Sequence, residues 1–198
     1  VFPPQDTIVS AVLTAAFAAP AFAALKSGDT APDFTATASL GGKDYTFRLE
    51  DALKKGPVVV YFYPSAFTSG CDLEAHTFAT EKEKFDAAGA SIIGVSADSL
   101  ARLNQFEVDP KYCAGKFPVA SDANLKIAHS YGLEASAAKA GAKDVRGVEI
   151  GHGFIERTTF VVGKNGKILA TLSSKDDGLS PDAHVDKSLA MVQQLAGK

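Results

Sequence analysis

An uninterrupted apolar segment, Val58 to Tyr63, reads VVVYFY and sets the fold class of this chain. A continuous run of β-branched and aromatic residues is typical of a strand that is buried on both faces at the centre of a sheet. Gly56-Pro57 precedes the run and Pro64 follows it, so chain-breaking residues delimit the strand at both ends. The sequence therefore predicts an α/β domain with this strand in the middle of its sheet.

Strand and helix patterns alternate along the rest of the chain, as in α/β proteins. A helix follows the loop at 65–70, with Leu73, Phe78, Phe85 and Ala88 among its apolar positions. The remaining strands are expected at 35–38, 44–48, 91–96, 117–120, 154–162 and 167–172, and the remaining helices at 49–55, 99–106, 124–131 and 181–196.

Two hairpins are expected in this sheet. The first two strands form an antiparallel pair, and Asn165-Gly166 is a strong turn signal between the last two. The order of elements resembles a thioredoxin-like fold: a central mixed β-sheet flanked by helices, with an N-terminal β-hairpin extension. Leu133 to Gly153 is irregular and is read as an inserted segment, a surface loop that shapes the site or contacts a partner.

Charge and cysteine content exclude several classes of function. The net charge of −3 and the absence of a long Lys or Arg run oppose nucleic acid binding. Cys71 and Cys113 are the only two cysteines, too few for a disulfide scaffold or a thiolate metal site. The four histidines show no metal-binding spacing, so neither a metal nor another cofactor is expected.

The N-terminal stretch resembles an export leader. Thr7 to Ala23 is almost wholly apolar and ends in an A-x-A pattern, which predicts a signal peptide at 1–23, cleavage after Ala23 and one domain at 24–198. A periplasmic or secreted protein without stable membrane association would result. The alternative is an amphipathic or poorly ordered N-terminal helix, and residues 1–6 lack the basic residues of a typical leader.

The loop after the central strand carries the most specific motif, Pro64-Ser65-Ala66-Phe67-Thr68-Ser69-Gly70-Cys71. Its Pro-x-x-x-Thr-x-x-Cys spacing resembles the active-site motif of the peroxiredoxin family. The segment from Glu156 to Phe160 is similar to the one that supplies this family's active-site arginine, here Arg157. The resemblance covers 27–198 and is closest to the Q-type, or bacterioferritin comigratory, branch. It implies a thiol-dependent peroxidase that reduces hydrogen peroxide and organic hydroperoxides, with an external thiol reductant.

The chemistry requires an ionised thiol, because the thiolate is the nucleophile and a free cysteine has a pKa of about 8.5. Cys71 falls at a helix N-terminus, where N–H groups and the helix dipole favour an anion. The Arg157 guanidinium would keep the sulfur anionic and hold a peroxide oxygen. The Thr68 hydroxyl would donate to the thiolate and accept from the peroxide, while Pro64 shields the sulfur from water.

Cys113 is the expected resolving thiol, which condenses with the sulfenic acid of Cys71 to form an intramolecular disulfide. Many Q-type members carry this cysteine five residues after the first, where this chain has His76. A packed Cys71 would not reach Cys113 within about 7 Å, so local unwinding is expected. An inert thiol and a static disulfide are the alternatives for Cys113.

Other interpretations remain open for the same residues. Cys71 as a buried structural thiol and Arg157 as a surface residue paired with Glu156 are the alternatives. Glu74 either neutralises the first helical turn or orients Arg157. The alternative function is a thioredoxin-like thiol:disulfide oxidoreductase, which the absent C-x-x-C pair opposes; a copper carrier is a third. The protein is expected to be a monomer or a homodimer.

Overall fold

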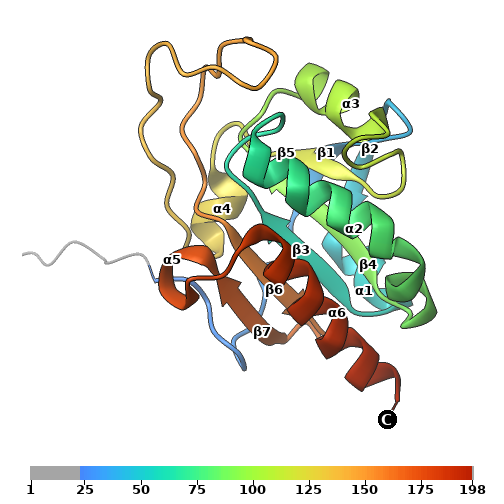
Figure 1. Ribbon diagram of the computed structural model, residues 1–198. Helices are drawn as coiled ribbons and strands as arrows, with labels where there is room; N and C mark the ends of the chain where they lie inside the picture. Colours follow the sequence, from blue (N-terminus) through green and yellow to red (C-terminus); the bar gives the residue numbers. More distant parts are fainter. Residues whose placement is uncertain (1–22, 198) are drawn as a thin grey trace, which may run out of the picture.

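The computed structural model describes residues 23–197, so the predicted signal peptide lies outside the described part of the chain except for Ala23 (Figure 1). The strands are β1 (Thr35–Leu40), β2 (Lys43–Arg48), β3 (Val58–Phe62), β4 (Ser91–Ser96), β5 (Val119–Ser121), β6 (Thr158–Val162) and β7 (Ile168–Ser173). The helices are α1 (Leu49–Lys55), α2 (Ser69–Ala87), α3 (Leu100–Val108), α4 (Lys126–Ser130), α5 (Ser174–Asp177) and α6 (Pro181–Ala196). Each expected strand and helix is present with ends shifted by up to a few residues, and α5 is additional.

The strands form one mixed sheet in the order β2-β1-β5-β4-β3-β6-β7. All residues of β3 are buried, and the strand runs parallel to β4 and antiparallel to β6. β1 and β2 form the N-terminal hairpin, which joins the sheet through β5, and β6 and β7 form the second hairpin. The predicted mixed sheet and both hairpins are confirmed, and β3 is an inner strand buried on both faces, although β4 occupies the middle position.

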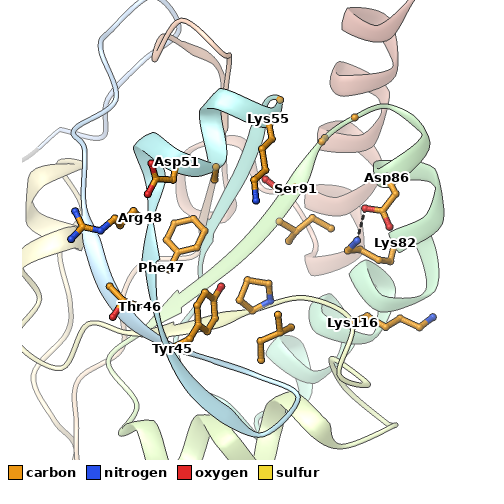
Figure 2. Close-up of a pocket in the computed structure, with 17 residues that line it drawn as sticks. Tyr45, Thr46, Phe47, Arg48, Asp51, Lys55, Lys82, Asp86, Ser91 and Lys116 are labelled. Carbon is orange, nitrogen blue, oxygen red and sulfur yellow. Dashed lines mark hydrogen bonds and ion pairs between the residues drawn. The ribbon is translucent and has the colours of Figure 1, made fainter.

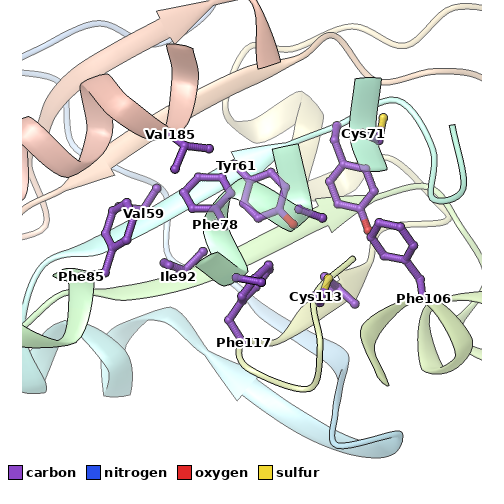
Figure 3. Close-up of a cluster of buried hydrophobic side chains, with 14 of the residues drawn as sticks. Val59, Tyr61, Cys71, Phe78, Phe85, Ile92, Phe106, Cys113, Phe117 and Val185 are labelled. Carbon is purple, nitrogen blue, oxygen red and sulfur yellow. The ribbon is translucent and has the colours of Figure 1, made fainter. Parts of the chain in front are cut away.

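The side chains of β3 divide the core in two, because successive residues of a strand point to opposite faces. Val59 and Tyr61 join a cluster beneath α2, α3 and α6, which we call the front cluster. Val58 and Val60 join a second cluster beneath α1 and α4, the back cluster. α2 and α6 lie side by side across the front of the sheet (Figure 1). The front cluster also holds both cysteines (Figure 3).

The apolar face of α2 differs from the prediction at one position. Phe78 and Phe85 are fully buried, as expected, but Leu73 is 47% exposed. Leu73 precedes Phe78 by five positions, which places it about 140° away around a helix. The buried face of α2 instead continues through Ala75.

The predicted start of β6 at Phe154 is wrong, because the chain there pairs with the inserted segment and not with the sheet. The Ser136 N–H donates to the Phe154 carbonyl at 2.9 Å, and the Glu156 N–H donates to the Glu134 carbonyl at 3.1 Å. β6 therefore begins only after Arg157, at Thr158.

The short helix α5 was not expected, although its sequence carries capping signals. The Ser173 side chain accepts a hydrogen bond from the Asp176 N–H at 3.0 Å, and Gly178 ends the helix in a left-handed conformation. Across residues 23–197, no helix combines the length and the apolar character needed to cross a membrane.

Candidate active site

The active-site loop, by which we mean residues 64–70, leaves the carboxyl end of β3 and includes the first two residues of α2. Thr68 is its last extended residue, with φ −122° and ψ 139°, and its carbonyl accepts a hydrogen bond from the Asp72 N–H at 2.8 Å. Cys71 therefore lies in the first turn of α2, where backbone N–H groups have no partner within the helix. The cysteine is buried, with 2% exposure.

Arg157 reaches Cys71 because β6 pairs with β3. Phe62 lies opposite Thr158 in this register, so the residue before β6 emerges beside the active-site loop. The Arg157 Nη2 group donates to Cys71 Sγ at 3.2 Å, and the Nη1 group donates to the Glu74 carboxylate. Residues far apart in the sequence thus meet at one guanidinium.

Pro64 and Gly70 shape the active-site loop through their backbone and their small or missing side-chain groups. Pro64 has no N–H and cannot extend the ladder of β3, in which Tyr63 still donates to the Val95 carbonyl at 3.1 Å. At Gly70, an added Cβ would lie 3.3 Å from Arg157 Nη2, so glycine leaves room for the guanidinium above the helix start.

The Cys71 sulfur sits in a pocket that opposes its ionisation. Burial raises the pKa of the Cys71 thiol, and this outweighs the lowering caused by the Arg157 guanidinium and the Thr68 hydroxyl. Arg157 and Thr68 act in the expected direction on the pKa of Cys71, but they do not offset the effect of burial. The physical reason is that the sulfur has lost its water, and the nearby Glu74 carboxylate also raises its pKa.

Glu74 is directed to Arg157 and caps no helical N–H at the start of α2. Its side chain is fully buried, and burial raises the pKa of Glu74 to about 7 against the lowering effect of Arg157. Cys71 and Glu74 are thus two acids that share one guanidinium, and their protonation is coupled. When Glu74 is neutral, the positive charge of Arg157 is available to the sulfur.

The Thr68 hydroxyl is oriented differently from the sequence-based expectation. It donates its proton to the Ser65 carbonyl at 2.8 Å. A hydroxyl has only one proton, so donation to the Cys71 sulfur requires this bond to be exchanged for a new one. The Thr68 side chain nevertheless lowers the pKa of Cys71.

Cys113 lies in the turn after α3 and is completely buried. Both cysteines are free thiols, and burial raises the pKa of Cys113 well above its usual value. Figure 3 shows the rings of the front cluster between and around the two sulfur-bearing residues. A static disulfide is therefore not present in this conformation.

Asp98 is a buried residue of the site that sequence reasoning missed. Its carboxylate accepts hydrogen bonds from the Ala66 N–H at 2.7 Å and the Ser65 hydroxyl at 2.9 Å. His152 lies 2.8 Å from Asp98, and this hydrogen bond raises the pKa of His152 against the opposing effect of burial. The sequence did hold a signal for Asp98. The parallel strands β3 and β4 end at the same edge of the sheet, and Asp98 follows β4 closely, so it could have been placed beside the active-site loop.

Comparison with known proteins identifies the family to which this site belongs. Residues 27–171 match the AhpC/TSA family. The chain belongs to this family, that of the peroxiredoxins. It is 33% identical over 176 residues to the chloroplastic peroxiredoxin Q of Sedum lineare, a match that covers 88% of this chain and 81% of the relative.

The fold also resembles solved structures of peroxiredoxins, among them the following two. Peroxidoxin BcpB of Mycobacterium tuberculosis superposes with a TM-score of 0.71 at 31% identity, covering 86% of this chain and 98% of that one. Peroxiredoxin Q of Xanthomonas campestris gives a TM-score of 0.62 at 27% identity, covering 82% and 91%. The Q-type and bacterioferritin comigratory resemblance is confirmed, and the chain is a thiol-dependent peroxidase of this family.

A cavity of about 600 Å³ lies at the opposite edge of this peroxiredoxin, where β3 and β4 begin (Figure 2). Four cationic residues line it, but Arg48 and Lys116 point away from its centre, and Lys82 is paired with Asp86. Lys55 alone among them points inward, so the lining does not concentrate positive charge.

The buried His184 of α6 predicts a pH dependence of folding for this peroxiredoxin. Its ring nitrogens contact the hydroxyls of Thr159 and Ser174, both at 3.0 Å. Burial, with the Arg157 guanidinium, lowers the pKa of His184 to about 4. The unfolded imidazole binds a proton below about 6.5, so between these values the unfolded state holds more protons and stability falls as pH falls.

We therefore expect His184→Gln to remove about 1 to 2 kcal/mol of the change in unfolding free energy between pH 7 and pH 5. Urea denaturation of both proteins at the two pH values measures this difference. The raised pKa of Glu74 acts in the opposite direction, but it is common to both proteins and cancels. His76→Gln, at an exposed position of α2, is the matched control. Equal pH slopes for the wild type and His184→Gln would contradict the prediction.

Proposed function

We propose that this peroxidase reduces hydrogen peroxide and organic hydroperoxides through a sulfenic acid on Cys71, which Cys113 then resolves as an intramolecular disulfide. The observation that carries the proposal is the contact of 3.2 Å between Arg157 Nη2 and Cys71 Sγ at the start of α2. A cysteine in a helix N-terminal turn beside a fixed cation is the arrangement in which a thiol becomes a nucleophile.

The first step is attack of the Cys71 thiolate on one oxygen of the peroxide. The sulfur–oxygen bond forms as the O–O bond breaks, and the two electrons of that bond leave with the second oxygen as hydroxide or alkoxide. The leaving oxygen takes up one proton, which balances the proton lost by the thiol. Arg157 stabilises the charge on sulfur before the step and on the leaving oxygen after it, because its planar fork offers several donors.

The second step is displacement of water from the sulfenic acid by the Cys113 thiol, which leaves a disulfide. Both cysteines are buried in the front cluster, so this step requires the start of α2 or the turn at Cys113 to unfold locally. A dithiol reductant then reopens the disulfide by exchange. With an export leader at 1–23, as we also propose, that reductant acts outside the cytosol in a periplasmic or secreted setting.

The resolving role of Cys113 is tested with Cys113→Ser. We expect the variant to consume one equivalent of hydrogen peroxide at Cys71 at the wild-type rate. Turnover should then stop if the only reductant present is a dithiol that reduces disulfides but not sulfenic acids. Stopped-flow detection of the thiol, followed by mass spectrometry, measures both events. The wild type should yield a peptide pair linking Cys71 and Cys113.

Cys113→Ala is the second variant, because it keeps the buried site apolar. Sustained turnover by both variants with that reductant would exclude Cys113 as the resolving thiol. It would leave the role of Cys71 untouched.

A further inference from the structure

The inserted segment, residues 133–153, holds the active-site loop at two points. The Val145 N–H donates to the Phe67 carbonyl at 2.9 Å. The Arg146 guanidinium lies over the Phe67 ring, with its central carbon 3.2 Å from the ring centroid. One residue of the loop is thus held through both its backbone and its side chain.

Phe67 has a backbone conformation that needs such support. Its φ is +58°, in the left-handed region that costs an L-residue about 1 to 2 kcal/mol. A strained residue of this kind persists only where its surroundings fix it. The neighbouring Ala66 is held as well, since its N–H donates to Asp98 at 2.7 Å and its carbonyl accepts from Arg102 at 2.9 Å.

Buried ion pairs join these contacts into one network. Asp144 of the inserted segment has no exposed side-chain surface and accepts from Arg102 and from Arg146, both at 2.8 Å. Arg102 is also paired with Asp98 at 2.9 Å. Loss of Arg146 would therefore remove the cation nearest to the Phe67 ring, whereas Arg102, whose central carbon lies 5.3 Å from the ring centroid, would still pair with both buried carboxylates.

Phe67 also contacts the turn that carries Cys113. Its ring meets Tyr112, the residue before Cys113, edge-on at a centroid distance of 5.4 Å, and Phe106 at 5.1 Å. The ring therefore contacts the inserted segment on one side and the Cys113 turn on another.

We infer that Arg146 is a positioning residue that holds Phe67 and thereby keeps the active-site loop in its peroxide-reactive conformation. This inference rests on the proposed function. Arg146 favours attack on peroxide, which needs the closed loop, and slows disulfide formation, which needs the open one. A cation–π contact of this kind corresponds to a change of about tenfold in the balance between the two conformations.

The experiment compares Arg146→Ala with Lys143→Ala, which removes an exposed cation from the same segment and makes no side-chain contact with the loop in the described structure. One equivalent of hydrogen peroxide is mixed with each protein, and the oxidation of Cys71 and the formation of the disulfide are timed separately. We expect Arg146→Ala to slow the first rate and to speed the second, so that the ratio of the second rate to the first rises by about tenfold. Arg146→Lys, which keeps the charge, should fall between, and Lys143→Ala should match the wild type.

Hydrogen exchange of the peptide at 64–72 gives a readout that does not depend on Cys113. Exchange should be about tenfold faster in Arg146→Ala than in Lys143→Ala. Unchanged hydrogen exchange would overturn the inference. So would rates of Cys71 oxidation and disulfide formation that both fall or both stay at the wild-type values, because a purely structural role lowers thermal stability without changing these two rates in opposite directions. Failure of the proposed function has a different signature: the wild type itself would leave Cys71 unoxidised or form no disulfide.

Discussion

Replacing Cys71 with serine is expected to reduce peroxide consumption to the rate of a solution without enzyme. The exchange of one sulfur for one oxygen preserves the shape of the pocket but removes the nucleophile, since a serine hydroxyl does not ionise near neutral pH and does not attack an O–O bond. Arg157 and Glu74 would still face each other, so the fold should be kept. Peroxide consumption with a thiol reductant, followed over many turnovers, measures the effect.

Cys113→Ser is the matched control, because it makes the same chemical exchange at the other buried cysteine. It retains the first oxidation, whereas Cys71→Ser should lose it. Circular dichroism shows whether both variants are folded. Turnover by folded Cys71→Ser at more than a trace of the wild-type rate would refute the mechanism.

Replacing Arg157 is expected to slow the oxidation of Cys71 by peroxide by about 10² to 10³-fold, the usual loss when a donor to a developing oxyanion is removed. The reason is visible in the pKa of Cys71, which burial raises and Arg157 lowers. Without the guanidinium, the buried sulfur would be protonated more completely, and the leaving oxygen would lose its donor. The second-order rate constant for loss of the Cys71 thiol, measured across pH, reports both effects.

Simple removal of Arg157 leaves Glu74 as a buried charge without a partner, which typically destabilises a protein by about 3 to 5 kcal/mol. The double variant Arg157→Gln with Glu74→Gln avoids this by removing both charges at once. Lys175→Gln is the control, because it removes an exposed cation that pairs with the neighbouring Glu156. A double variant that is folded and reacts within threefold of the wild type would show that Arg157 does not assist the reaction.

Local sequence signals predicted the strands and helices well where an apolar pattern is bounded by turn or capping residues. The apolar run at 58–63 identified β3, and the Asn165-Gly166 pair identified the turn between β6 and β7. The limits of α6 were also predicted, because Pro181 stands at its start and its apolar positions repeat with helical spacing. Such signals depend only on residues a few positions apart.

The site was only partly predictable, because its geometry depends on contacts between distant segments. The motif placed Cys71 at a helix start, but its partner Arg157 followed from family resemblance and not from any local pattern. The contact of Arg146 with Phe67 joins two loops that have no regular structure, so no periodicity marks it. The raised pKa of Cys71 could not be foreseen either, since it reflects burial by the complete fold.

The division of the core by β3 has a consequence for how the molecule withstands its own reaction. Both thiols belong to the front cluster, and neither belongs to the back cluster beneath α1 and α4. A rearrangement that brings the two sulfurs together can therefore be confined to one layer, while the opposite layer and the hairpin between β1 and β2 stay assembled. The back cluster can thus stay folded through each redox cycle, and the front cluster can repack against it when the disulfide is reduced.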